Sequence, residues 1–256
     1  MVELSVIIPA YNEEKRIEKS LSLYLPIITK RFKSYEMIVV CNGCTDNTPE
    51  IVKKISKNNP NVTLLEFKEK IGKGGAIIEG IKVARGEIIG FLDADASTLP
   101  ESVISLVESI GEHDGIIGSR WVRGALIYQK QPYIRRVLSR VFNILVKLLF
   151  DLKYEDTQCG AKFFKKEAIK KVASEVCLTD WSFDVELLYR MKLHGFTVKE
   201  HPIKWAENGH SKLHLMKTPI KMFFSVVGLR MKFDKRFERL TKSRLASWLY
   251  WRLKRL

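Results

Sequence analysis

The feature that most restricts the fold is a series of short apolar runs separated by segments of helical length. The runs fall at residues 4–8, 37–40, 62–67, 88–92 and 116–117. Strands that are apolar throughout are buried on both faces, and their alternation with helices is typical of βαβ units. We expect the intervening helices to begin near Asn12, Thr45 and Gly72. The pattern predicts an α/β fold with a mostly parallel sheet flanked by helices.

Two aspartates, Asp93 and Asp95, directly follow the apolar run 88–92. Side chains two positions apart in extended chain point the same way, so both carboxylates can reach one ion. The carboxyl ends of strands in open α/β sheets are where ligands bind, and a hard divalent cation suits oxygen ligands. The alternative is a strand end that caps the next helix, because Asp and Ser are common there.

Two loops add candidate ligand contacts. In the segment Pro9–Glu13, Tyr11 could stack on a base and Glu13 could hydrogen-bond to it, although an ordinary strand-to-helix turn explains the segment as well. One interpretation of the glycine-rich segment 70–76 is that it opens a helix, where backbone N–H groups favour anions. The other interpretation is a plain turn with a flexible lysine. The segment matches neither the Walker A pattern nor the dinucleotide pattern of glycines.

The second half predicts long helices over 133–150 and from about residue 180 to His194. The first is amphipathic, with a broad apolar face. Asp156 lies after it and could act as a base or an orienting group. Asp184 and Glu186 in the second helix diverge by about 200°, so we expect one to face the site and the other to face solvent.

Charge is distributed unevenly along the 256 residues. Residues 1–118 hold 14 Lys and Arg against 17 Asp and Glu, whereas residues 119–256 hold 30 against 12. Such a basic half attracts a polyanion, either nucleic acid or an anionic membrane surface. Residues 219–256 combine 11 basic and 2 acidic residues with Trp248, Tyr250 and Trp251. They predict amphipathic helices at a membrane interface, or helices packed on the sheet with a solvated basic face.

Composition predicts one large domain, residues 1–218, followed by the basic helices of residues 219–256. The sequence contains no run of 18 apolar residues and starts directly in a predicted strand, so we expect a peripheral protein on the cytoplasmic face of a membrane. Four cysteines lie at spacings that fit no disulfide framework, which is typical of a reducing compartment.

Five segments together resemble the inverting glycosyltransferases of the GT-A fold, family 2, which is Rossmann-like. They are residues 6–13, 43–46, 72–76, 93–95 and 118–120. Segments 156–160, 181–188 and 211–213 resemble the dolichyl-phosphate β-glucosyltransferases most, and the dolichyl-phosphate mannose synthases second. The resemblance implies transfer of a hexose, with inversion, from a nucleotide diphosphate sugar to a polyprenyl phosphate. The expected donor is UDP-glucose, and GDP-mannose is the alternative.

The resemblance also implies roles for single residues. Contacts to the nucleotide sugar are expected from Pro9, Tyr11, Glu13, Asn42, Asp93, Ala94, Asp95 and Lys212. Asp93 and Asp95 would bind Mg²⁺ or Mn²⁺, Asp95 and Asp156 would be catalytic, and Arg120, Arg135 and Ser139 would bind the lipid phosphate. One departure is Cys41–Cys44, where the family usually has Asp-Asp-Gly-Ser.

Two alternatives come from other classes of protein. A nucleic-acid-binding protein would use the basic half, but it would not explain the acidic strand end, and no recognition motif is present. We therefore expect no nucleic-acid partner. A catalytically inactive membrane adaptor of the same fold is disfavoured by the intact Asp93, Asp95 and Asp156.

Overall fold

The computed structural model describes residues 2–129, 132–180, 182–207 and 217–233. The chain divides into two compact units. Unit 1 comprises Met1–Lys130 and Glu155–Gly209, and unit 2 comprises Gln131–Tyr154 and His210–Leu256. This division follows contacts within the chain, and the predicted boundary between residues 218 and 219 stays a prediction.

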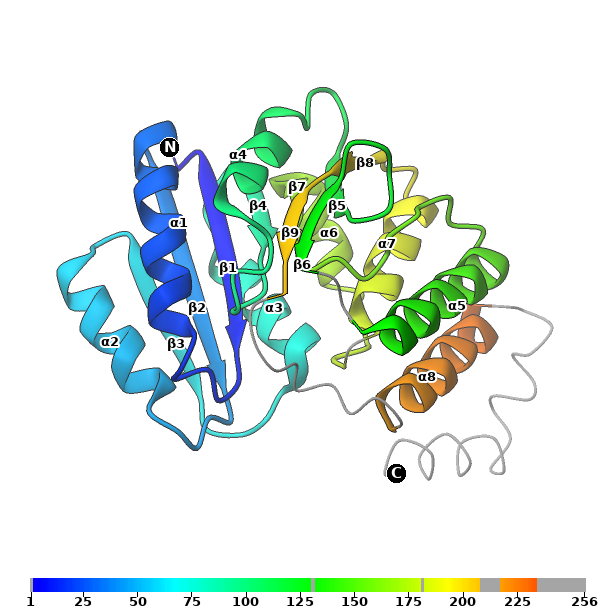
Figure 1. Ribbon diagram of the computed structural model, residues 1–256, viewed down its shortest axis with the longest axis horizontal. Helices are drawn as coiled ribbons and strands as arrows, with labels where there is room; N and C mark the ends of the chain where they lie inside the picture. The colour runs from blue at the N-terminus through cyan, green and yellow to red at the C-terminus, as the bar shows by residue number, and fades with distance from the viewer. Residues whose placement is uncertain (1, 130–131, 181, 208–216, 234–256) are drawn as a thin grey trace. The chain divides into compact units, whose positions relative to one another are not determined.

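Unit 1 is built on a seven-stranded sheet in the order β3-β2-β1-β4-β7-β5-β8 (Figure 1). The strands are β3 (Val62–Phe67), β2 (Tyr35–Asn42), β1 (Leu4–Ala10), β4 (Ile88–Phe91), β7 (Lys162–Lys165), β5 (Gly115–Ser119) and β8 (Val198–Pro202). Strands β3, β2, β1 and β4 are parallel, β7 is antiparallel to both neighbours, and β5 and β8 are parallel. A second sheet pairs β6 (Leu126–Gln129) with β9 (Lys204–Ala206).

Helices form a layer on each side of the large sheet. Helix α1 (Ile17–Arg31) packs against α2 (Thr48–Asn58) and α4 (Pro100–Glu108). Helix α3 (Gly72–Val83) packs against α6 (Lys166–Ala173) and α7 (Phe183–Leu193). All eight residues of β2 are buried, which is the burial expected of a strand covered on both faces. The predicted α/β class is thus confirmed.

The strand order reverses between β1 and β4, and this reversal locates the site. The chain leaves β1 toward β2 and β3 on one side, and α3 then returns it to β4 on the other. Ligands of open α/β sheets bind outside the carboxyl ends of the strands at such a point. The Leu92 amide donates to the carbonyl of Ile7 (2.9 Å), so the loops after β1 and β4 start side by side.

The predicted start of the first helix at Asn12 is wrong, because α1 begins at Ile17. Asn12 instead adopts a left-handed conformation with φ of 55°. Its side-chain oxygen accepts from the Thr45 amide (2.8 Å), and its Nδ2 donates to the Thr45 hydroxyl (3.1 Å). Asn12 therefore ties the loop after β1 to the loop after β2.

Unit 2 contains α5 (Tyr133–Phe150) and α8 (Lys217–Phe233), which pack against each other. Val146 and Phe150 of α5 and Val226 and Leu229 of α8 are buried. The polar Asn143 of α5 is buried as well, and its side-chain amide donates to the carbonyl of Tyr154 (3.0 Å). Within the described residues, no helix is both long and apolar enough to cross a membrane. The predicted basic segment beyond Phe233 lies outside the described residues.

Candidate active site

The acidic pair lies at the carboxyl end of β4, beside the point where the strand order reverses. Asp93 Oδ1 is 2.7 Å from the ammonium of Lys73, which comes from the start of α3. Asp95 accepts a hydrogen bond from the Ser97 amide (2.9 Å). Ala94 between them is buried, and its carbonyl accepts from the Ser20 hydroxyl of α1 (2.6 Å). The loop is therefore fixed by both helical layers.

The two carboxylates differ in their pKa. Burial raises the pKa of Asp95, and the neighbouring charge of Asp93 raises it further. Burial also opposes ionisation of Asp93, but the charge of Lys73 outweighs it, and the pKa of Asp93 is lowered. Lys162 and Arg120 act on Asp93 in the same direction. The loop thus holds two interacting anions surrounded by cations.

The donor set at this loop fits a divalent cation that is shared with a substrate. Asp93 and Asp95 offer carboxylate oxygens, which are the ligands preferred by Mg²⁺ and Mn²⁺. No cluster of three or more metal-binding side chains occurs in the described part of the chain. Two protein carboxylates with the remaining positions left to phosphate oxygens and water match the usual binding of Mg²⁺.

The predicted nucleoside contacts surround the ends of β1 and β2. The Asn42 amide is buried and donates to the carbonyl of Ala10 (3.0 Å), which fixes its orientation. The Lys70 ammonium lies 3.9 Å from the centre of the Tyr11 ring, so a cation covers one face of the predicted stacking ring. Pro9 is the penultimate residue of β1, directly before this loop.

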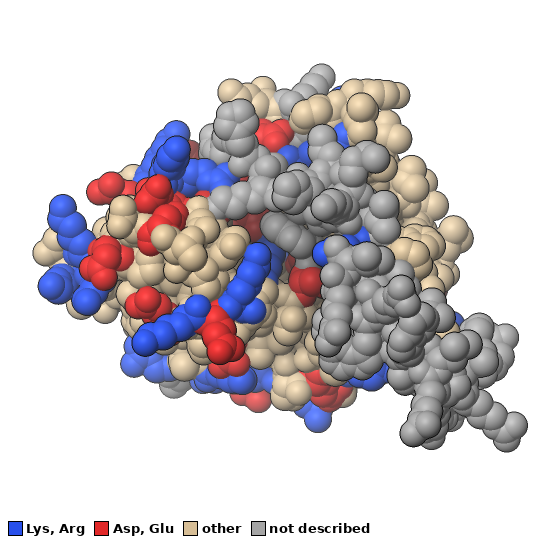
Figure 2. Space-filling view, turned by 90° about the horizontal axis from the view of Figure 1, so that it is seen from below, with Lys and Arg blue, Asp and Glu red and all other residues tan. Residues whose placement is uncertain are grey.

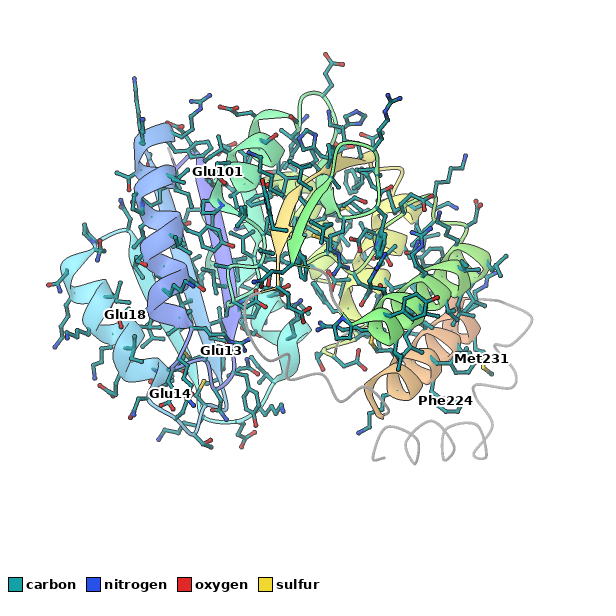
Figure 3. The ribbon with its side chains drawn as sticks, in the orientation of Figure 1. Glu13, Glu14, Glu18, Glu101, Phe224 and Met231 are labelled. Carbon is teal, nitrogen blue, oxygen red and sulfur yellow. The ribbon has the colours of Figure 1, made fainter. Side chains whose placement is uncertain are left out.

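Glu13 is the fourth predicted nucleoside contact in this region. Its carboxylate accepts two hydrogen bonds from the Arg16 guanidinium, at 2.7 and 2.8 Å. Figure 3 labels Glu13 and Glu14 near the foot of α1. The structure therefore brings Pro9, Tyr11, Glu13 and Asn42 to the carboxyl ends of β1 and β2. Figure 2 shows the molecule from below, with basic and acidic side chains interspersed on the visible face.

Asp156 and Arg120 form a bidentate ion pair. The guanidinium donates from Nε to Oδ2 (2.7 Å) and from Nη2 to Oδ1 (2.9 Å), and the Arg120 amide donates to Oδ2 (3.0 Å). Asp156 is 2% exposed. Burial opposes its ionisation, yet Arg120 prevails and lowers the pKa of Asp156. Asp156, which was predicted to be catalytic, and Arg120, which was predicted to bind the lipid phosphate, thus pair with each other.

The prediction that one of Asp184 and Glu186 faces solvent is wrong, because both are buried. Asp184 accepts from the ammonium of Lys162 (2.6 Å), and Lys162 is 0% exposed. Glu186 accepts from the amides of Cys177 (3.0 Å) and Leu178 (2.7 Å) and pairs with Arg190. Nine of the eleven residues of α7 are buried, so the helix has no solvent face for either carboxylate.

The remaining predicted contacts fall elsewhere. Lys212 lies outside the described residues. Arg135 and Ser139 lie one turn apart on α5, in unit 2, and both are half-buried.

Sequence reasoning did not single out Lys73, Gly160 or Lys162, all of which contact a site carboxylate or its partners. The Gly-Lys-Gly-Gly loop was the available signal for Lys73.

The sheet, its order reversal and its acidic loop are those of the GT-A class of α/β proteins. A similar structure is glucosyl-3-phosphoglycerate synthase from Mycobacterium tuberculosis, solved with Mn²⁺, UDP-glucose and phosphoglyceric acid. It has a TM-score of 0.69 at 17% identity, and the match covers 91% of this chain and 82% of that one. The family model described as glycosyl transferase family 2 matches residues 5–173. The chain belongs to this family and is a glycosyltransferase.

Similar curated proteins include a dolichyl-phosphate beta-glucosyltransferase of Dictyostelium discoideum, 32% identical over 91% of this chain and 75% of that protein. The human dolichyl-phosphate beta-glucosyltransferase is 32% identical over 90% of this chain and 76% of its own length. Glycosyltransferase AglD of Haloferax volcanii is 33% identical over 86% of this chain. The matched part spans only 36% of AglD, so that protein contains much that this chain does not align with.

Proposed function

We propose that the chain transfers glucose from UDP-glucose to a polyprenyl phosphate, such as dolichyl phosphate, with inversion at the anomeric carbon. The observation that carries this proposal is the Asp93–Asp95 loop, which concentrates carboxylates and cations where the strand order reverses. The similarity to dolichyl-phosphate beta-glucosyltransferases over most of the chain supports the choice of sugar and acceptor.

In this proposal the donor lies across the ends of β1, β2 and β4. Tyr11 and Asn42 contact the base, Glu13 and Pro9 line its pocket, and Ala94 contacts the nucleotide through the loop backbone. Asp93 and Asp95 hold Mg²⁺ or Mn²⁺, which when bound neutralises the diphosphate leaving group. The contact of Lys212 with the diphosphate stays a prediction.

The acceptor needs little help from a base. The second pKa of a phosphate monoester is about 6, so most of the acceptor is a dianion at neutral pH. Asp156 is buried and held in its ionised form by Arg120, an arrangement that suits orientation better than proton transfer. We therefore assign to Asp156 the positioning of the Arg120 guanidinium, and to Arg120 a contact with the acceptor phosphate.

The acceptor is a lipid, and unit 2 has a surface that suits a membrane. Helix α5 exposes large apolar side chains along its length: Tyr133, Ile134, Val137, Leu138, Val141, Ile144 and Leu148. It also carries three arginines and a lysine and no acidic residue. Helix α8 exposes Phe223 and Phe224, also without an acidic residue, and Figure 3 labels Phe224 and Met231 on it.

Apolar side chains at headgroup depth, flanked by cations, bind anionic membranes. We therefore propose that unit 2 attaches the protein peripherally to an anionic leaflet on the cytoplasmic side. The predicted contacts of Arg135 and Ser139 with a lipid phosphate stay predictions.

A sugar panel tests the function. The full chain is incubated with polyprenyl phosphate in vesicles, Mn²⁺, and radiolabelled UDP-glucose or GDP-mannose, and the label extracted with the lipid is counted. We expect label from UDP-glucose. Preferential transfer from GDP-mannose would reassign the donor, and label from neither donor, with nucleotide binding intact, would overturn the proposed acceptor.

A further inference from the structure

The ammonium of Lys73 donates a hydrogen bond to a carboxylate oxygen of Asp93, which is a proposed metal ligand. The distance from Nζ to Oδ1 is 2.7 Å, and the lysine side chain is 13% exposed. Although burial opposes the charged form of this ammonium, the charges of Asp93, Asp184 and Asp95 act on it and together raise its pKa. The lysine of this pair is largely buried, whereas the Asp93 side chain is 40% exposed and therefore accessible to a ligand.

The backbone fixes where this lysine starts. Gly72 has φ of 80°, and a Cβ at this position would lie 2.2 Å from the carbonyl oxygen of Thr179. The Gly74 amide donates to the same carbonyl (2.9 Å). The glycines on both sides of Lys73 are thus held against residue 179, and the lysine stem extends from a constrained turn toward Asp93.

The carboxylate is confined from the other side by Gly160. A Cβ added to Gly160 would lie 1.9 Å from Asp93 Oδ2 and 2.6 Å from Oδ1. Asp93 therefore has little room to turn away from Lys73 on that side. An ammonium and a divalent cation repel each other, so both cannot bind Oδ1 at full strength.

We propose that Lys73 is a resident counter-cation of Asp93, which a metal–diphosphate complex displaces and which then pairs with the diphosphate. This inference rests on the proposed function, since it requires a nucleotide diphosphate at the acidic loop. The diphosphate gives the displaced ammonium a new anionic partner, whereas a metal ion that arrives alone gives it none. Metal and nucleotide therefore bind synergistically, and each must raise the affinity for the other by the same factor.

The experiment measures binding without transfer. Isothermal titration of the full chain gives Kd for Mn²⁺ alone, for UDP alone in EDTA, and for Mn²⁺ at saturating UDP. Lys73→Met should bind Mn²⁺ alone about 10-fold more tightly than the unaltered chain and UDP alone more weakly, with a smaller coupling factor. Lys73→Arg, which keeps the charge, should retain most of the coupling.

Lys82→Met is the matched control. Lys82 lies on the same helix, is 62% exposed and pairs with Glu79 on the surface, so its loss changes the net charge equally and should leave all three constants unchanged. Melting curves in EDTA check the fold. If Lys73→Met unfolds, Lys73→Gln supplies the comparison, because it removes the charge and keeps a hydrogen-bond donor.

The outcomes separate this inference from the proposed function. If the unaltered chain binds Mn²⁺ and UDP together but the uncharged variant binds Mn²⁺ alone no more tightly, the counter-cation role is overturned and the proposed donor site stands. If the unaltered chain binds neither ligand, both are overturned. Tighter Mn²⁺ binding combined with weaker UDP binding in the uncharged variant supports the inference.

Discussion

At the scale of single residues, the site is a set of paired charges rather than free catalytic groups. Asp93 pairs with Lys73, Asp156 with Arg120, Asp184 with Lys162, and Glu13 with Arg16. Each of these carboxylates has a cationic partner before a substrate arrives, and for the buried Asp156 and Asp184 this avoids the cost of an unpaired buried charge. Asp95 differs from these carboxylates, because burial and the charge of Asp93 raise its pKa above the ordinary value. Its charge is thus the one that a bound cation would stabilise most.

The first prediction follows from this difference. Asp95→Asn removes a proposed metal ligand at a half-buried position and keeps the size of the side chain. Transfer should therefore fall at least 100-fold, on the order of the loss of one strong electrostatic contact, while the melting temperature in EDTA stays within a few degrees. Glucose transfer with Mn²⁺ and differential scanning fluorimetry check the two parts. Unimpaired transfer by this variant would remove Asp95 from the metal site.

A second prediction concerns Gly160. Its Cβ in Gly160→Ala would lie 1.9 Å from Asp93 Oδ2, so the carboxylate must move. Moving a group of the active site out of its productive position costs on the order of 100-fold in turnover. Glucose transfer measures the loss. Gly111→Ala is the control, because its Cβ has only one neighbour, at 3.9 Å, and a stability measurement shows whether its own strained backbone matters. Equal turnover in the two variants would contradict the confinement of Asp93.

At the scale of elements, the sequence predicted those whose pattern is set locally. The run 62–67 and the amphipathic helix 133–150 appear with the expected bounds. The antiparallel β7 was not predicted, because two phenylalanines between two lysines define no strand by themselves. The ion pairs Arg120–Asp156 and Lys162–Asp184 could not be predicted either, since only the folded sheet brings these distant positions together.

The third prediction belongs to α5. Val141 and Leu148 are 59% and 79% exposed, so replacing both with Asp removes apolar membrane contacts and adds repulsion without disturbing the core. Each lost apolar contact and each added acid near an anionic leaflet costs about 1 kcal/mol, so vesicle affinity should fall at least 100-fold. Flotation with phosphatidylserine vesicles at low salt measures this.

Val83→Asp on α3 is the matched control, since Val83 is 48% exposed and belongs to unit 1. It should leave flotation unchanged. Equal flotation of the α5 double variant and the unaltered chain would place the membrane contact on another surface.

At the scale of the whole molecule, a hydrogen-bond network around the buried Glu36 joins β1, β2 and the segment before β4 at the end of the sheet opposite the site. Glu36 of β2 accepts from the Ser5 hydroxyl of β1 (2.6 Å) and from the amide (2.7 Å) and guanidinium of Arg85, which precedes β4. Burial opposes ionisation of Glu36, but these hydrogen bonds prevail, and its pKa is lowered. The network acts on stability and leaves the donor and acceptor sites untouched.

The fourth prediction is a pH dependence of the free energy of unfolding. Because the folded pKa of Glu36 lies below its ordinary value, its contribution is present above that ordinary value and is lost as the pH falls through the folded pKa. Glu36→Gln should cost about 1.5–3 kcal/mol at pH 7, the usual value of hydrogen bonds to a charged group. Urea unfolding at pH 7 and at pH 3 checks this. The difference between variant and unaltered chain should shrink at pH 3, and an equal difference at both would contradict the ionised role.

The order of elements along the chain has a consequence for biosynthesis. Helix α5 is made before β7, which lies in the middle of the large sheet, and long before its partner α8. During translation, the apolar and cationic α5 therefore emerges from the ribosome before its packing partner α8 has been made. At that time the large sheet still lacks its central strand β7. During that interval both apolar faces of α5 are uncovered in the nascent chain: the face that α8 later covers and the face that stays exposed in the folded protein. Association with a membrane or a chaperone can thus precede completion of the catalytic unit.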